Sequence, residues 1–168
     1  MTLLYAQPYD ISAEGFYFRT IEEYRTEAAN LKNDYGDPVE EFEIQFIDGD
    51  DIDCELAKIW NLNQANFNAF IEAANEWDES KKIYYIIAVG ECGYAHEQVA
   101  DRFNEVDIDI YETESLKELA EEFVEEGLFG DIPERLQFYI DYDAIARDLA
   151  VEYCETEIVG QRLIYRCG

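Results

Sequence analysis

The sequence predicts an α+β protein made of three small modules in series, and three observations support this. Runs with the two-residue period of strands are interleaved with runs of helical period along the 168 residues. Two capping-box sequences mark helix starts near residues 20 and 115. Apolar residues make up 48% of the chain and aromatic residues 15%, enough to bury a core. We place the modules at residues 1–50, 51–104 and 105–168.

The first module is predicted to be a small sheet with one helix. Leu3–Pro8 and Gly15–Arg19 are aromatic-rich runs separated by a polar turn, which is typical of two strands. A capping box at Thr20 begins a helix predicted to run to about Asn33. Glu41–Ile47 then alternates polar with apolar residues, which predicts a half-buried strand with one carboxylate-bearing face.

The second module is predicted to be mainly helical. Apolar residues recur at helical spacing on both sides of the polar link Asn61–Asn63, and His96–Phe103 is predicted as a further short helix. The stretch Lys81–Val89 stays open from its residues alone, because the run Tyr84–Ile87 favours a strand whereas the acidic lead-in Asp78–Ser80 is typical of a helix start. The residues at helical spacing are Leu56, Ile59, Trp60, Phe67, Phe70, Ile71 and Ala74.

The third module begins with a strand and a helix. Val106–Ile110 alternates as a strand, and Ser115 with Glu118 forms the second capping box. The helix that follows is predicted to end at Gly127. Its apolar stripe contains Leu116, Leu119, Ala120, Phe123 and Val124.

The rest of the third module is predicted to hold another helix and two closing strands. Pro133 lies in the first turn of that helix. Tyr153–Ile158 and Arg162–Arg166 are predicted strands joined by a turn at Gly160-Gln161. The pair Phe138–Tyr139, like the run Phe16–Phe18, is expected in the core rather than at a contact surface. The buried side of the helix is expected to carry Leu136, Tyr139 and Ile140.

Charge is the outlying property of the chain: 40 Asp and Glu residues against 12 Lys and Arg give a net charge of −28. Nucleic acid is excluded as a direct partner, because binding it needs a basic face. A basic protein surface, a cation or survival in high salt remain as uses for this acidity. Residues 34–55 hold ten carboxylates and no Lys, Arg or His, and residues 105–134 hold twelve against Lys117.

These two segments supply a candidate acidic surface. Glutamates three and four apart on the helix after Ser115 lie about 5–6 Å from their neighbours. Duplex DNA carries one charge per about 1.7 Å of axis, so −28 corresponds to about 48 Å of duplex, and a twofold dimer would double it. The surface consists of Asp48, Asp50, Asp51, Asp53, Glu55, Glu105, Asp107, Asp109, Glu112, Glu114, Glu118, Glu121, Glu122, Glu125, Glu126, Asp131 and Glu134.

Other chemistry finds little support in the sequence. The acidic loop Asp48–Asp53 does not fit the spacing of a calcium-binding EF-hand, and His96 near Cys92 has no third group that would complete a metal or catalytic site. Phosphate-binding and hydrolase motifs are missing from the sequence. We therefore expect no catalytic residue, cofactor or metal, and enzyme is the minor hypothesis. Cys54, Cys92, Cys154 and Cys167 form no CxxC pair and are expected to be free thiols.

The cellular location of the protein is predicted from the lack of a secretory signal and of a membrane-spanning segment in the sequence. Met1–Tyr9 has neither the basic start nor the long apolar run of a secretory signal. The most apolar stretch, Ile83–Val89, is far shorter than the roughly 18 residues of a membrane span. We expect a soluble cytoplasmic protein with no membrane partner.

The run Gly130–Leu149, GDIPERLQFYIDYDAIARDL, closely resembles the C-terminal run of the ArdA antirestriction family. Weaker similarity extends through Ser115–Gly127 and back to Glu40–Ile44 and Leu56–Trp60, so the resemblance spans the chain. It implies a homodimer of elongated, three-module subunits, encoded on mobile elements. Such a protein would protect incoming DNA in the cytoplasm by inhibiting type I restriction–modification enzymes.

The resemblance also implies roles for single residues. The central module of the family is helical, which favours a helix over Lys81–Val89. Arg147 is expected to pair with a local carboxylate, and Ala146 departs from the family, where we associate glycine with this position. The matched positions are expected to be structural, and they are Pro133, Leu136, Tyr139, Ile140, Asp141, Tyr142, Arg147, Asp148 and Leu149.

Three functions are therefore weighed. The first is a DNA mimic that occupies the DNA groove of the methyltransferase and specificity core of a type I enzyme. The second is an acidic module for another DNA-binding protein, such as a CRISPR effector. The third is a divalent-metal-binding protein or metal-dependent hydrolase, which would depend on one or two acids rather than on many. The target system, the dimer interface and any effect on modification are left open.

Overall fold

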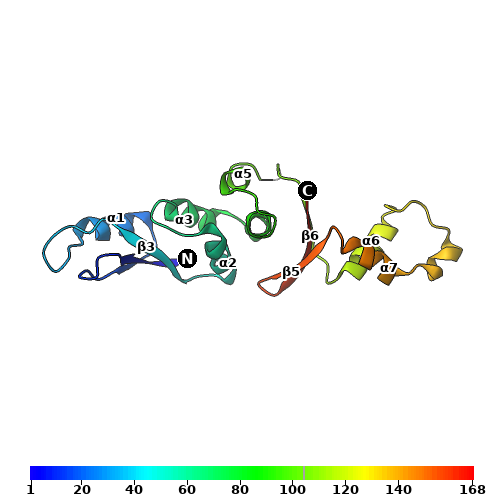
Figure 1. The fold of residues 1–168 in the computed structure, drawn as a ribbon, viewed down its shortest axis with the longest axis horizontal. Helices are drawn as coiled ribbons and strands as arrows, with labels where there is room; N and C mark the ends of the chain where they lie inside the picture. Colours follow the sequence, from blue (N-terminus) through cyan, green and yellow to red (C-terminus); the bar gives the residue numbers. More distant parts are fainter. Residues whose placement is uncertain (104) are drawn as a thin grey trace. The chain divides into compact units, whose positions relative to one another are not determined.

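The computed structural model describes residues 1–103 and 105–168 and confirms the α+β class (Figure 1). Helices accompany two small antiparallel sheets of three strands each. The chain divides into two compact units, residues 1–86 and 87–168, which are described separately here. The division into three modules at residues 50/51 and 104/105 stays a prediction.

The first unit opens with a sheet in the order β2-β1-β3. Its strands are β1 (Leu3–Pro8), β2 (Phe16–Phe18) and β3 (Phe42–Asp48), and all three predicted strands are confirmed. Both pairings are antiparallel, with Leu4 opposite Phe18 and Ala6 opposite Ile44. Alternate side chains of β1 are buried on the face toward the core, as the two-residue period requires. With α1 (Ile21–Asn30) between β2 and β3, the order is β-β-α-β as predicted.

The helix α1 starts where the capping box predicts but ends earlier. The Thr20 hydroxyl accepts a hydrogen bond from the Glu23 N–H at 3.1 Å. The Glu23 carboxylate accepts from the Arg19 N–H at 2.6 Å, so the return bond reaches one residue beyond the usual box. The helix ends at Asn30, not Asn33, because Lys32 forms a β-bridge with Pro38 and the chain is already extended there.

The remainder of the first unit is helical. The two helices predicted on either side of the Asn-rich link are confirmed, and Lys81–Val89 is helical, as the family resemblance implies. The Asp78 carboxylate caps this stretch by accepting from the Lys81 N–H at 2.8 Å. Trp60 lies at the centre of the packing, with its ring 5.0 Å from that of Tyr85 and 5.8 Å from that of Phe70. The segments are α2 (Asp51–Trp60), α3 (Phe67–Glu76), α4 (Glu79–Tyr85) and the π-helix η1 (Ile86–Glu91), which continues into the second unit.

The second unit contains a sheet in the order β4-β6-β5, with both pairings antiparallel. Leu119 and Phe123 of the helix α6 pack on Ile164 of the central strand and form the core of this unit. The predicted strands and the helix after Ser115 are confirmed, although the first strand begins two residues later than predicted. The elements are α5 (His96–Ala100), β4 (Ile108–Tyr111), α6 (Leu116–Glu125), the 3-10 helix η2 (Glu134–Tyr139), α7 (Tyr142–Leu149), β5 (Cys154–Ile158) and β6 (Gln161–Cys167).

The predicted helix after Pro133 is wrong in its form and its burial. A short 3-10 helix, η2, ends at Tyr139, the backbone of Ile140 is extended, and Asp141 then caps the separate helix α7. Leu136 and Tyr139 are exposed, and Phe138 is 92% exposed. The expectation that these three side chains are buried is wrong, because none of the six residues of η2 is buried. The core of the unit is covered instead by α6 and its neighbours.

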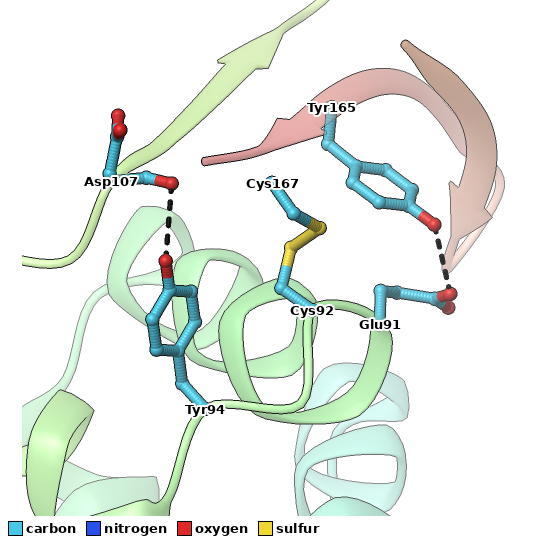
Figure 2. The surroundings of a disulfide bond; sticks show 6 residues. All are labelled: Glu91, Cys92, Tyr94, Asp107, Tyr165 and Cys167. Atoms are coloured by element: carbon cyan, nitrogen blue, oxygen red, sulfur yellow. Dashed lines mark hydrogen bonds between the residues drawn. A yellow bond between two sulfur atoms is a disulfide. The ribbon is translucent and has the colours of Figure 1, made fainter. Parts of the chain in front are cut away.

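The expectation of four free thiols is also wrong. Cys92 and Cys167 form a disulfide, whereas Cys54 and Cys154 are free. The two sulfurs are 75 residues apart in sequence, but β6 brings its last residue to the segment that follows η1 (Figure 2). Two hydrogen bonds flank the bond: the Tyr165 hydroxyl donates to the Glu91 carboxylate at 3.1 Å, and the Tyr94 hydroxyl donates to the Asp107 carbonyl at 3.4 Å.

Candidate functional site

The acids between β3 and α2 form the first part of the acidic surface. Asp48, Asp50 and Asp51 are exposed, and the last two stand at the start of α2. Carboxylates at a helix N-terminus interact favourably with the exposed N–H groups there, so the fold tolerates this cluster. Glu55, one turn further along, is half-buried and paired with Lys58 at 2.6 Å.

Asp53 does not belong to this surface, which corrects its assignment. Its side chain is only 4% exposed and accepts a hydrogen bond from the Lys82 ammonium at 2.5 Å. That ammonium is 6% exposed and also donates to the Ala74 carbonyl at 2.8 Å. The Thr2 hydroxyl lies 3.4 Å from the second oxygen of Asp53. Asp53 lies on the inner side of α2, so its charge is used to join α2, α3 and α4.

The helix α6 carries the densest part of the surface. Leu119, Ala120 and Phe123 face inward, which leaves the opposite side of the helix to acids. Lys117, the one cation within α6, is engaged by Asp143 of α7 at 3.2 Å. The exposed acids of the helix and its C-terminal end are Glu118, Glu122, Glu125 and Glu126, whereas Glu121 is half-buried.

The ends of α6 are held by further carboxylates. The Ser115 hydroxyl accepts from the Glu118 N–H at 3.2 Å, and Glu118 in turn accepts from the Glu114 N–H at 3.0 Å. This offset matches the one at the start of α1. Glu155 of β5 accepts from the Leu116 N–H at 3.1 Å and so caps the same helix from the sheet.

The acids before α6 are mostly exposed. Asp107, Glu112 and Glu114 are exposed, and Glu105 lies 3.9 Å from Arg102 in an exposed pair. Asp109 is half-buried and accepts from Arg166 at 2.6 Å, which raises the pKa of that guanidinium further. Asp109 is therefore partly neutralised and adds less to the surface than its neighbours.

The residues matched to the family run are little buried in the described chain. Pro133, Asp131 and Glu134 are exposed around η2, as are Asp141 and Asp148 on and before α7, whereas Tyr142 is half-buried. The Asp141 carboxylate accepts from the Ala144 N–H at 3.0 Å and so caps the start of α7.

The expected pairing of Arg147 with a local carboxylate is not found. Arg147 is exposed and forms no ion pair within residues 1–103 and 105–168. The carboxylate one turn earlier, Asp143, is taken by Lys117.

Further exposed acids lie outside the acidic surface that the sequence predicts. Residues 141–157 contain six acids against Arg147, a density that could have marked them. Residues 34–43 belong to an acidic segment of the sequence, but the predicted acidic surface includes none of them. The exposed acids of these two stretches are Asp34, Asp37, Glu40, Glu41, Glu43, Asp141, Asp143, Asp148, Glu152, Glu155 and Glu157.

The exposed acids of each unit are hydrogen-bond acceptors that suit basic side chains. In the described part of the chain, no group of three or more His, Cys, Asp and Glu residues is placed to hold a metal ion. Cys92 has no thiol to offer to His96, because it is bonded to Cys167. No helix among the described residues is long and apolar enough to cross a membrane.

Comparison with known protein families matches residues 19–159 to the model described as antirestriction protein (ArdA). The match takes in parts of both units and every residue of the predicted acidic surface. No curated protein matches the chain.

Proposed function

Because the chain belongs to the ArdA family of antirestriction proteins, we propose that it is a DNA mimic that inhibits type I restriction–modification enzymes in the cytoplasm. Its acidic surface occupies the basic groove that otherwise holds duplex DNA, in the methyltransferase and specificity core. The chain catalyses no reaction in this role and contacts no nucleic acid itself. Its acids replace phosphates as partners of lysine and arginine side chains.

The observation that carries this proposal is the outer side of α6. Glu118, Glu122, Glu125 and Glu126 are exposed, and they include pairs three and four residues apart, where like charges destabilise a helix. Glu118 has one bond to the backbone, but the fold makes no ion pair with the other three in the described chain. These glutamates destabilise the helix and add no ion pair to the fold. Binding to a basic partner explains why the chain carries them.

We also propose that the active form is a homodimer, which would extend the acidic array. Large apolar side chains exposed on η2 and on the segment before it support this part, because exposed apolar and aromatic side chains are typical of protein interfaces. Equilibrium sedimentation of the wild-type chain and of a Phe138→Ser/Tyr139→Ser variant tests it: the variant should be monomeric, and a monomeric wild type would contradict the dimer. The exposed apolar side chains on η2 and on the segment before it are Leu128, Phe129, Leu136, Phe138 and Tyr139.

Competition for DNA tests the mimicry directly. The chain should displace a labelled duplex from a purified type I methyltransferase core, and its affinity should fall steeply as salt rises, because the binding depends on charge. The fourfold variant Glu118→Gln/Glu122→Gln/Glu125→Gln/Glu126→Gln should compete much more weakly, while each single change has a small effect. Affinity that is independent of salt, or loss of inhibition from one substitution in a folded chain, would contradict mimicry.

A further inference from the structure

Two loops of the first unit are joined by a polar network around Asp10 and Asn33. The Asp10 carboxylate accepts from the Ser12 N–H at 2.9 Å, from the Ser12 hydroxyl at 2.7 Å and from the Asn33 amide at 2.9 Å. The Asp34 N–H donates to the Ser12 carbonyl at 3.0 Å. Figure 1 shows both connections, β1 to β2 and α1 to β3, at the end of the sheet away from α2.

The second loop is further fixed by its own hydrogen bonds. The Asn33 side-chain oxygen accepts from the N–H groups of Tyr35 and Asp37 at 3.0 and 2.9 Å, and the turn passes through Gly36 at φ +87°. Hydrogen bonds from Asn33 and Ser12 also lower the pKa of Asp10, so its carboxylate stays charged and the network stays intact at neutral pH. The two loops therefore form a preorganised frame.

Three large side chains stand on this frame without burial. Ile11 is fully exposed, Tyr35 is 84% exposed, and Tyr9, two residues before Ile11, is 65% exposed; we call these three residues the loop tip. Tyrosine is favoured at protein interfaces because it brings a large contact area with few rotatable bonds. Residues held in place before binding lose little entropy when a partner covers them.

The charge around the loop tip indicates which partner it suits. The two loops, residues 9–15 and 31–41, contain six carboxylates against Lys32. Glu14, Asp34 and Asp37 are exposed. A second copy of the loop tip would present the same negative charge and be repelled, whereas a basic protein surface with an apolar recess would match both the acids and the loop tip.

We propose that the loop tip is an apolar anchor that inserts into a recess on the basic surface of the bound DNA-handling enzyme. This inference rests on the proposed function and adds a second kind of contact to it. Exposed acids accelerate association and are screened by salt, whereas buried apolar anchors lengthen the lifetime of a complex and are little affected by salt. The loop tip thus supplies a contact that duplex DNA itself does not offer.

Surface plasmon resonance on an immobilised type I methyltransferase core separates the two kinds of contact. For Ile11→Ser/Tyr35→Ser we expect koff to rise by about tenfold to a hundredfold, with kon within about twofold of wild type and the salt dependence unchanged. The charge variant Asp34→Asn/Asp37→Asn on the same loops should instead lower kon and weaken the salt dependence. Ile47→Ser, an exposed apolar change elsewhere in the first unit, is the matched control and should leave koff unchanged.

The possible outcomes are distinguishable. A wild-type koff for Ile11→Ser/Tyr35→Ser, with wild-type binding intact, overturns the loop-tip anchor and leaves the proposed function standing. An equal rise of koff for Ile47→Ser also overturns the anchor, because the effect would not belong to the loop tip. A change in the sedimentation mass of the unbound double variant would assign the tip to self-association and overturn it as well. Absence of wild-type binding to the core overturns both proposals.

Discussion

At the scale of single residues, the pair of Asp53 and Lys82 shows that the role of an acid depends on whether it is buried or exposed. Both side chains are nearly inaccessible to water, and each satisfies the other. Removing one partner leaves a charge uncompensated in the interior, which is far worse than losing a surface ion pair. The sequence contains 40 acids, and their pattern does not mark Asp53 as the buried one, because its neighbours Asp50 and Asp51 on the same turn are exposed.

Lys82→Met is predicted to destabilise the first unit by about 3–5 kcal/mol, because Asp53 then remains buried without its cation. Urea denaturation followed by tryptophan fluorescence reports on this unit, since both tryptophans lie in it. Lys58→Met, which breaks the exposed pair with Glu55, is the matched control and should change stability far less than Lys82→Met. Equal effects of the two changes would show that the buried pair has no special role.

A second residue-scale prediction concerns the turn between β5 and β6. Val159 has a φ of +51° and is followed by Gly160 at φ +77°, and a β-branched residue is unfavourable in this left-handed region. Val159→Asn is predicted to stabilise the second unit by about 1 kcal/mol, because asparagine and glycine are preferred in such two-residue turns. Thermal unfolding should show a higher midpoint for the variant. Val151→Asn, a change at another exposed valine whose φ is not positive, serves as control, and a lower midpoint for Val159→Asn would contradict this prediction.

At the scale of elements, the local signals in the sequence predict much of the fold. Capping boxes at Thr20 and Ser115 give the starts of α1 and α6, and strict alternation gives β3. These local signals fail where contacts between residues distant in sequence determine the secondary structure. The run around Tyr84–Ile87 has strand propensity, but it is helical because Tyr85 and its neighbours pack in the core beside Trp60.

The candidate site is predicted less completely than the fold. Charge density locates the acidic stretches, but it does not tell which acids face the core or cap a helix, as Asp53 and Glu155 do. The disulfide is missed because Cys92 and Cys167 are close only after β6 has formed. The exposure of Phe138 is missed because residue type alone favours burial for an aromatic side chain.

For α6, opposite effects on stability and binding are predicted for the fourfold glutamine variant described above. Removing like charges at three- and four-residue spacing should stabilise the helix by about 0.2–0.5 kcal/mol per close pair. The variant should therefore unfold at a higher urea concentration while competing less well with duplex DNA. A variant that loses both stability and competition would indicate that these glutamates support the fold.

At the scale of the whole molecule, the disulfide is the longest-range covalent constraint in the described chain. Its reduction is predicted to lower the stability of the second unit by about 2–4 kcal/mol, because a loop of 75 residues is released in the unfolded state. Thermal unfolding with and without dithiothreitol measures this. Cys92→Ser/Cys167→Ser should unfold at the midpoint of the reduced wild type, with or without dithiothreitol. The midpoint of Cys54→Ser/Cys154→Ser should fall on reduction, as that of the wild type does. Identical midpoints for the reduced and oxidised wild type would contradict the prediction.

The outward side of α6 also bears on how such a chain can diverge. Its glutamates touch little of their own protein, so an acid lost at one position can be compensated by an acid gained a turn away. Lineages can thus reshuffle these positions freely while total charge is retained. The acidity would then persist among distant relatives long after the individual positions had ceased to align.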